Sequence, residues 1–272
     1  MRSRIAEILN LKYRPLALVW AGEKPGGAIE FKPGRWNCVM FAFANVVKGK
    51  TAAFSRQTYG CWGGGVGLGF GNCYTDFPGG EECFHGFLSS GNKYSDKGRA
   101  VGEKLKEAGL TEFYDDFMEG ERYIKVPEQV RAFVENLPIT DIPAEYVLLK
   151  PLDRIDDPEQ VKTITFLVNP DQLCALVVLA NYARETYDNV TIPFAAGCQA
   201  IGILPYAEAE RDRPRAVVGL MDPSARKHLR RLLDKDQMSF SMPLSLFQEM
   251  EANVEESFLF RKTWKAVAGR ED

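Results

Sequence analysis

Two segments of the chain repeat one pattern of cysteine, alanine, asparagine and glycine, and this repeat limits the architecture more than any other feature. The first segment reads Cys38-x5-Ala-Asn followed by Gly60-Cys61-x3-Gly, and the second reads Cys174-x5-Ala-Asn followed by Gly197-Cys198-x3-Gly. Each pattern ends before a β-branched residue, and nearly equal intervals separate its two cysteines. Two such matches predict a tandem duplication of one unit.

Apolar runs around each pattern extend the match. The short apolar runs predict strands. An amphipathic stretch with helical spacing follows residues 123–127 and another follows residues 239–243, and each predicts a helix. The runs pair as residues 16–20 with 164–168, 123–127 with 239–243, and 146–149 with 258–260. Each half is therefore predicted to read strand, helix, strand, Gly-Cys turn, strand, helix, strand, with proline at the start of the second helix.

The repeat also predicts the organisation of the chain. The first copy spans residues 14–152 with an insert near 70–120, and the second copy spans residues 160–264. Strands alternating with helices predict an α/β (or α+β) fold. Because each copy alone is small and leaves sheet edges to cover, we expect the copies to pack about a pseudo-two-fold axis in one compact body.

Charge and hydropathy exclude several classes of partner. The net charge is -3, and no basic face of the kind that nucleic-acid binders carry is predicted. No apolar stretch is long enough to predict a membrane-spanning helix, and the first residues lack the features of a signal peptide. We therefore expect a cytoplasmic protein whose six cysteines are reduced.

The glycines beside Cys61 predict close approach of the backbone to something. Glycine inside a helix or strand costs conformational entropy, so a dense run of glycines requires a reason. We interpret Gly60, Gly63, Gly64 and Gly65 with Cys61, together with Gly197 and Cys198 in the second copy, as candidate cofactor-binding residues. Plain packing of small residues is an equally weighted interpretation.

Three thiols are candidate metal ligands. A cysteine at a turn from strand to helix lies near the positive end of the helix, which suits a thiolate ligand or a nucleophile. Under a pseudo-two-fold axis Cys61 and Cys198 would face one shared cleft, with Cys38 nearby, so that an iron–sulfur cluster is the leading cofactor. The expected partner is a small molecule or cofactor. Assembly into a homo-oligomer is an open alternative.

Two other functions remain open on the same residues. A reactive thiol at Cys61 or Cys198 would make the protein a thiol-dependent enzyme acting on a small molecule. Alternatively, the glycine turns bind an anion or another small ligand through backbone amides, and the cysteines are structural.

Other candidate residues have simpler interpretations. Cys38 and Cys174 both lie on apolar helix patterns, and packing in the core is the favoured alternative for each. A metal site of Cys73, Cys83 and His85 matches no standard spacing. Asp222, before Pro223, is expected to be a helix N-cap.

Several motifs together resemble a known family. Arg14-Pro15, Cys38, Cys61-Trp-Gly-Gly-Gly, Asn169-Pro170 and Cys198 resemble the bacterial and archaeal family called domain of unknown function 169. The resemblance implies no activity, because none is assigned to that family. Its members often have cysteines corresponding to Cys38, Cys61 and Cys198, and many have a further Gly-Cys where this chain reads Gly219-Leu220. The resemblance therefore implies at most three cysteine ligands here.

Overall fold

The computed structural model describes residues 1–269, which group into two compact units. The first unit consists of Met1–Phe70 and the chain from Thr140 onward, and the second is Gly71–Ile139. The second unit contains most of the predicted insert. The division therefore separates the insert region from the rest and does not fall between the two proposed copies.

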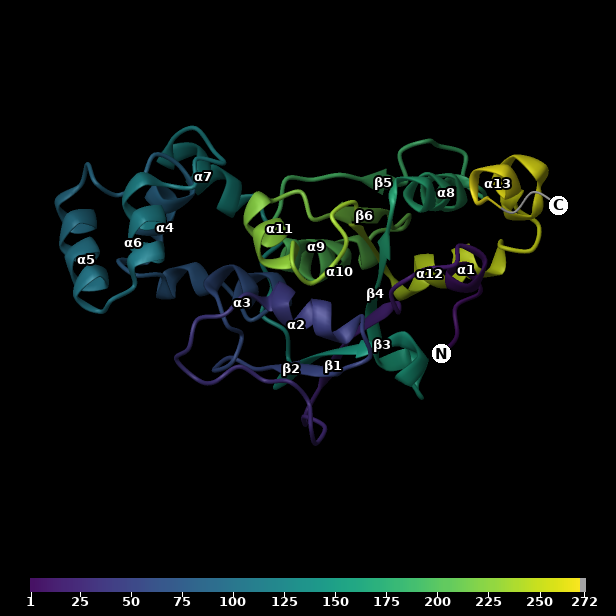
Figure 1. The fold of residues 1–272 in the computed structure, drawn as a ribbon, viewed down its shortest axis with the longest axis horizontal. Helices are drawn as coiled ribbons and strands as arrows, with labels where there is room; N and C mark the ends of the chain where they lie inside the picture. Colours follow the sequence, from purple (N-terminus) through teal and green to yellow (C-terminus); the bar gives the residue numbers. More distant parts are fainter. Residues whose placement is uncertain (270–272) are drawn as a thin grey trace. The chain divides into compact units, whose positions relative to one another are not determined.

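The first unit is built on one seven-stranded sheet, in the order β2-β3-β1-β4-β7-β6-β5 (Figure 1). Three strands lie within residues 14–152 and four lie within residues 160–264, so both segments contribute to one sheet. The mixed α/β class is thus confirmed. The strands are β1 (Leu16–Ala21), β2 (Ala52–Phe54), β3 (Tyr146–Pro151), β4 (Val161–Val168), β5 (Val190–Thr191), β6 (Ala216–Gly219) and β7 (Met238–Pro243).

The central pair, β1 and β4, joins the halves antiparallel, with Leu16 opposite Thr165. In each half the last strand pairs antiparallel with the first, β3 with β1 and β7 with β4. Only β5 and β6 pair in parallel among the named strands. The chain between those two strands contains the helices α9 (Gly197–Ile201) and α10 (Ile203–Ala209), and parallel pairing requires a crossover of this kind.

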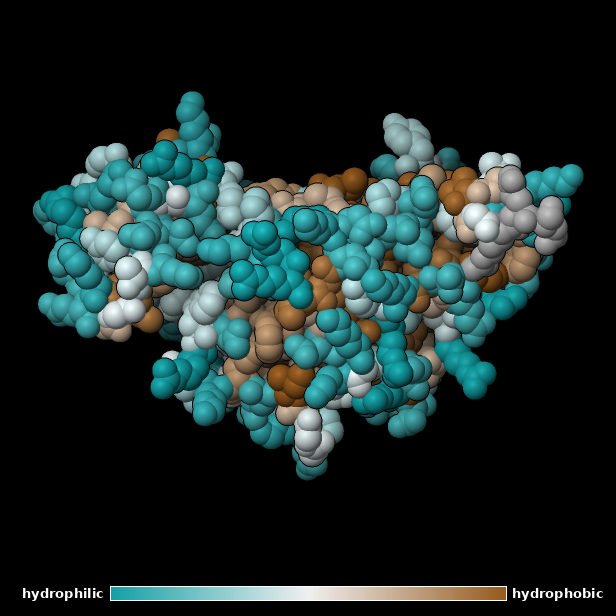
Figure 2. Space-filling model, viewed as in Figure 1, coloured by the Kyte–Doolittle hydropathy of each residue, from teal (hydrophilic) through white to brown (hydrophobic). Residues whose placement is uncertain are grey.

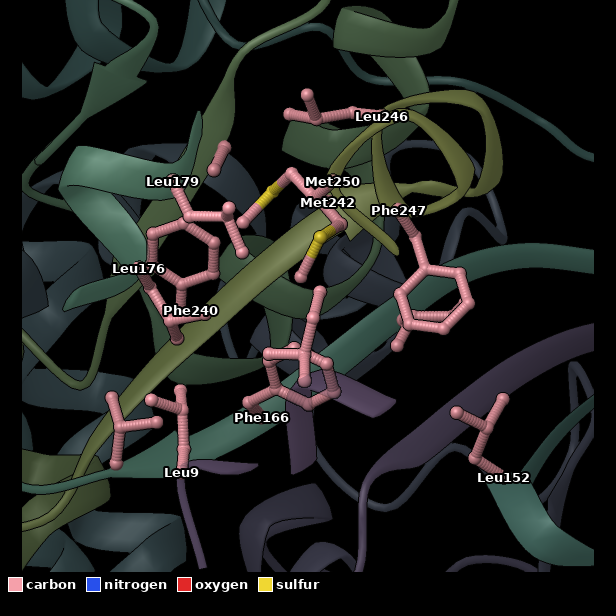
Figure 3. Close-up of a cluster of buried hydrophobic side chains, with 14 of the residues drawn as sticks. Leu9, Leu152, Phe166, Leu176, Leu179, Phe240, Met242, Leu246, Phe247 and Met250 are labelled. Atoms are coloured by element: carbon pink, nitrogen blue, oxygen red, sulfur yellow. The ribbon is translucent and has the colours of Figure 1, made fainter. Parts of the chain in front are cut away.

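One face of the sheet carries the main apolar core. Phe166 and Phe240 lie opposite each other on β4 and β7, and both are fully buried. Figure 3 shows them with Leu176, Leu246 and Met250, which come from covering helices. Alternation along the strands directs every second side chain to this face. The covering helices are α1 (Arg4–Ile8), α8 (Pro170–Asn181), α12 (Leu244–Ala252) and α13 (Lys262–Val267).

Other helices contact the opposite face of the sheet, to which the alternate side chains of the strands point. The hydroxyl of Thr163, on β4, donates to the carbonyl oxygen of Ile201 at 2.8 Å. Thr165 and Ser241 share a buried hydrogen bond of 2.9 Å between adjacent strands. The helices in this part of the unit are α2 (Val39–Val46), α3 (Trp62–Leu68), α9 (Gly197–Ile201), α10 (Ile203–Ala209) and α11 (Pro223–Leu229).

The second unit is helical and has an aromatic core. Phe77 contacts the rings of Phe84, Phe87, Phe113 and Phe117 at centroid distances between 5.2 and 6.1 Å. Its helices are α4 (Gly80–Leu88), α5 (Asp96–Glu107), α6 (Thr111–Glu119) and α7 (Pro127–Glu135). Within residues 1–269, no helix is both long and apolar enough to cross a membrane.

Two predicted strands are wrong. Residues 123–126 form bends, and the chain enters α7 at Pro127, so the second unit provides no neighbouring strand for them. Residues Phe258–Phe260 form a 3-10 helix capped by Ser257, and Phe258 packs edge-on against Trp264. Both runs are short and apolar, which is the composition of a strand. Each lies next to a helix start, however, and within residues 1–269 has no free sheet edge to pair with.

Candidate functional site

Two of the predicted cysteines begin helices. Cys38 is the N-cap residue of α2 and Cys61 is the N-cap residue of α3, both in extended backbone. The Cys61 sulfur accepts a hydrogen bond from the amide of Gly64 at 3.2 Å. Gly60, just before it, has φ +85°, a conformation that favours glycine. The predicted turn from strand to helix at Gly60-Cys61 is confirmed.

The third cysteine lies in the first turn of α9. The Cys198 thiol, which is buried, donates to the carbonyl oxygen of Gly63 at 3.0 Å. Gly197 is the first residue of that helix, and its amide donates to Asp222 Oδ2 at 2.7 Å. Asp222 is the predicted N-cap of α11, where its Oδ1 accepts from the amide of Ala225 at 2.6 Å. One carboxylate therefore connects the starts of two helices.

Glycines allow α3 and α9 to touch through their backbones. A Cβ on Gly67 would lie 2.7 Å from the carbonyl carbon of Cys198, and a Cβ on Gly202 would lie 2.0 Å from the carbonyl oxygen of Gly67. Both distances exclude a side chain unless the backbone moves. Close contact between two helices is thus one reason for the glycine run, whose residues 63–67 lie inside a helix and not in an open loop.

The starts of α2, α3, α9 and α11 adjoin one another. A Cβ on Gly64 would lie 2.6 Å from the Val39 side chain, and a Cβ on Gly197 would lie 3.0 Å from the Met40 sulfur and 3.2 Å from the Ala225 Cβ. Helix N-termini carry partial positive charge. The three thiols and the Asp222 carboxylate therefore lie where anionic groups are favoured.

Aromatic and apolar side chains are exposed beside these helix starts. Trp36, two residues before Cys38, is 54% exposed, and its ring contacts that of His228 on α11 at a centroid distance of 5.5 Å. Phe41 on α2 is also exposed. Figure 2 shows apolar residues gathered over the part of this face where α2 and α10 lie. The Trp36 ring thus connects the segment before α2 with the last turn of α11.

The electrostatics link the three cysteines with Asp222. Burial raises the pKa of Cys38 to about 12, and the neighbouring charge of Cys61 adds to this rise. Burial also raises the pKa of Cys198 well above its usual range, followed by the charges of Cys61, Cys38 and Asp222. The four groups are thus close enough to influence one another, and Cys38 and Cys198 are neutral thiols at pH 7.

The remaining cysteines do not join this group. Cys174 is exposed on α8, so its predicted core position is wrong. Cys73 and Cys83 belong to the second unit, where both are buried. Across residues 1–269, no three histidine, cysteine, aspartate or glutamate side chains are arranged to hold a single metal ion. The site is therefore a group of neighbouring thiols rather than a preformed ion-binding cage.

Two participants were missed in the sequence. Asp222 was expected only to cap a helix, yet it also binds the amide of Gly197. No role was predicted for His228, yet its ring contacts that of Trp36. Arg226, another residue of α11, donates to the carbonyl oxygens of Leu220, Lys235 and Gln237 and so fixes a loop. No local sequence signal links Asp222 with Gly197, because the contact depends on how α9 and α11 pack.

A family comparison agrees with these motifs. The family model described as DUF169, uncharacterised ArCR, matches residues 4–253, which include Cys38, Cys61, Cys198 and Asp222. No curated protein and no solved structure matches the chain. The chain belongs to the DUF169 family of uncharacterised proteins.

Proposed function

We propose that this protein binds an iron–sulfur cluster through Cys38, Cys61 and Cys198. The observation that carries the proposal is the electrostatic proximity of these three thiols at adjoining helix starts. Thiolates are the usual protein ligands of such clusters. When bound, a cluster supplies one-electron redox chemistry, so the protein would serve in electron transfer or redox sensing.

The donor set supports a cluster better than it supports a single ion. The ligands of a cluster bind different iron atoms, so their sulfurs do not need to meet at one point. Three thiols provide three of these ligands. Asp222, whose charge influences both Cys38 and Cys198, would provide an oxygen ligand at a fourth position. Its Oδ2 accepts only one hydrogen bond among residues 1–269, that from Gly197, and so keeps one lone pair.

The backbone around the thiols favours an anionic group. The amide of Gly64 already points at the Cys61 sulfur, and backbone amides of Met40 and Phe41 lower the pKa of Cys38 against the larger effect of burial. Hydrogen bonds to cysteine sulfurs tune the potential of iron–sulfur clusters. Burial disfavours free thiolates at Cys38 and Cys198. The positive charge of bound iron would compensate the charge of these thiolates, whereas a thiolate acting as a free nucleophile would lack such compensation.

The fold also supports an origin by duplication. In each half the first strand pairs antiparallel with the last, and the Gly-Cys pair begins a helix, α3 or α9, that packs against its counterpart. The outer strands of the two halves differ in their pairing. In the first half β2 pairs directly with β3, whereas in the second half β6 lies between β5 and β7. On this basis β3 would correspond to β7, so that the second copy would end near residue 243 and not at residue 264.

The proposal is tested with full-length protein prepared without oxygen. We expect iron and acid-labile sulfide in the purified or reconstituted protein, with a brown chromophore that dithionite bleaches. Cys38→Ser, Cys61→Ser and Cys198→Ser should each lower the iron content. Protein that stays colourless and free of iron after reconstitution would overturn the proposal.

Matched controls are available in the same chain. Cys174→Ser removes an exposed thiol of α8, and Cys73→Ser removes a buried thiol of the second unit. Both variants should keep the iron and sulfide content of the unaltered protein. An equal loss of iron in these controls would indicate adventitious binding to thiols in general.

A further inference from the structure

The second unit contains a cavity that has no part in the cysteine site. Its volume is about 370 Å³, and it lies between α4 and α7. Glu81 and His85 come from α4, one turn apart, and Arg131 and Glu135 come from α7, also one turn apart. Cavities of this size are typical of sites for small molecules.

His85 is the feature that points to a ligand. Its side chain lines the cavity, its residue is only 8% exposed, and within residues 1–269 its imidazole nitrogens have no hydrogen-bond partner. These nitrogens are not among the fully buried polar atoms of the described chain that lack a hydrogen bond, so they are accessible from the cavity and can bind a ligand there. Burial lowers the pKa of His85 most strongly; the charge of Glu81 opposes this effect, and the charge of Arg131 adds to it, with a net lowering. The ring is therefore neutral at pH 7 and offers one donor and one acceptor.

The charged groups around the cavity have opposite signs. In the described chain, neither Arg131 nor Glu135 forms an ion pair, and both residues are exposed at the mouth. Glu81 is held in place by the side-chain amide of Asn72, which donates to its Oε1 at 2.5 Å. One guanidinium and two carboxylates thus face the same space, and the remaining wall includes the apolar side chains of Val134 and Leu137.

We propose that this cavity binds a small zwitterion with an apolar side chain, that is, an apolar α-amino acid. Arg131 would bind the carboxylate, since a guanidinium pairs with a carboxylate through two parallel hydrogen bonds. Glu135 and Glu81 would bind the ammonium group, and the neutral His85 imidazole would complete the hydrogen bonds. The apolar wall would contact the side chain of the ligand.

Nuclear magnetic resonance of the full-length protein with ¹⁵N-labelled histidine tests this proposal. The chain has only two histidines, His85 and His228, so His228→Asn assigns both signals. The probe is L-leucine. We expect it to shift the His85 signals in a saturable way, with a Kd at or below about 1 mM, while the His228 signals stay unchanged.

Two analogues separate the charges of the ligand. Isoamylamine lacks the carboxylate of leucine, and 4-methylpentanoate lacks the ammonium group, so each should bind at least about tenfold more weakly than leucine. Arg131→Gln should weaken leucine at least about tenfold and leave isoamylamine unaffected. Glu135→Gln should weaken leucine and isoamylamine and leave 4-methylpentanoate unaffected.

Matched variants show whether the charges act at the cavity. Lys125→Gln and Glu128→Gln remove one charge each at exposed residues just before and within α7 that do not line the cavity. Both should bind leucine like the unaltered protein. Absence of a saturable His85 shift at about 10 mM leucine, equal binding of both analogues, or equal weakening by Lys125→Gln and Glu128→Gln would overturn the proposal.

Discussion

The Cys198 thiol donates a hydrogen bond of 3.0 Å to the carbonyl oxygen of Gly63. This bond connects the first turns of α9 and α3, the two helices that follow the Gly-Cys pairs. It also indicates a protonated thiol, in agreement with the raised pKa of Cys198. The contact between these helices has consequences for stability, for thiol reactivity and for the proposed cofactor.

Gly67→Ala should destabilise the protein, because its Cβ would lie 2.7 Å from the backbone of Cys198 and Gln199. The free energy of unfolding should fall by about 1–3 kcal/mol, as expected for overpacking. Gly63→Ala is the matched control in the same helix, since no atom lies within 4 Å of its Cβ. That variant should be unchanged or more stable by about 0.5–1 kcal/mol. Urea unfolding measures both, and equal stabilities would contradict the close helix contact.

Cysteine alkylation should separate the thiols by their position. In metal-free protein at pH 7, iodoacetamide should modify the exposed Cys174 and leave the buried Cys198 unmodified. Because the pKa of Cys38 is raised to about 12, its rate of modification should rise about a hundredfold between pH 7 and pH 9. Peptide mass spectrometry measures each site.

Denatured protein provides the reference for that experiment. In guanidinium chloride all six cysteines should react at similar rates. Rapid modification of Cys198 in the folded protein at pH 7 would disagree with its burial and would favour a thiol-dependent enzyme.

Asp222→Asn should destabilise the first unit, because the carboxylate accepts hydrogen bonds at the starts of both α9 and α11. An asparagine side chain turns one acceptor into a donor, which then faces a backbone amide. We expect the free energy of unfolding to fall by about 1–3 kcal/mol. Asp212→Asn, at an exposed loop residue, is the control and should be neutral. Circular dichroism during urea unfolding is the measurement, and neutral behaviour of Asp222→Asn would disprove its connecting role.

His85 should make the protein less stable as the pH falls. Burial holds the pKa of folded His85 below its ordinary value, so the unfolded chain binds the proton first. Between the ordinary value of about 6.5 and the lower folded value, the free energy of unfolding should therefore decrease with falling pH. His85→Asn removes this contribution and should flatten the curve from pH 7 to pH 5. The unfolding midpoint in urea at each pH is the readout, and identical slopes for both proteins would contradict the prediction.

Patterns that depend on neighbouring residues predicted local structure well. The N-caps at Cys61 and Asp222, the helix start at Pro127, and the strands at 16–20, 164–168, 146–149 and 239–243 lie where the sequence predicts them. Capping and alternation act over a few residues, so one sequence contains the whole signal.

The run at 258–260 marks the limit of that reasoning. Its composition suits a strand, but a strand also requires a partner edge, and Leu259 is instead buried in a 3-10 turn. Cys174 shows the same limit, because the helical pattern does not say which of its faces meets the sheet.

By itself, the sequence determined the family, the mixed α/β class, and the presence of Cys38, Cys61 and Cys198 at the starts of helices. Only the tertiary structure decided that those starts adjoin, that Asp222 connects two of them, and that His85 faces a cavity without a hydrogen-bond partner in the described chain. The reason is physical. Caps and turns depend on residues close in sequence, whereas the grouping of Gly63, Cys198 and Asp222 depends on how helices far apart in the chain pack on one sheet.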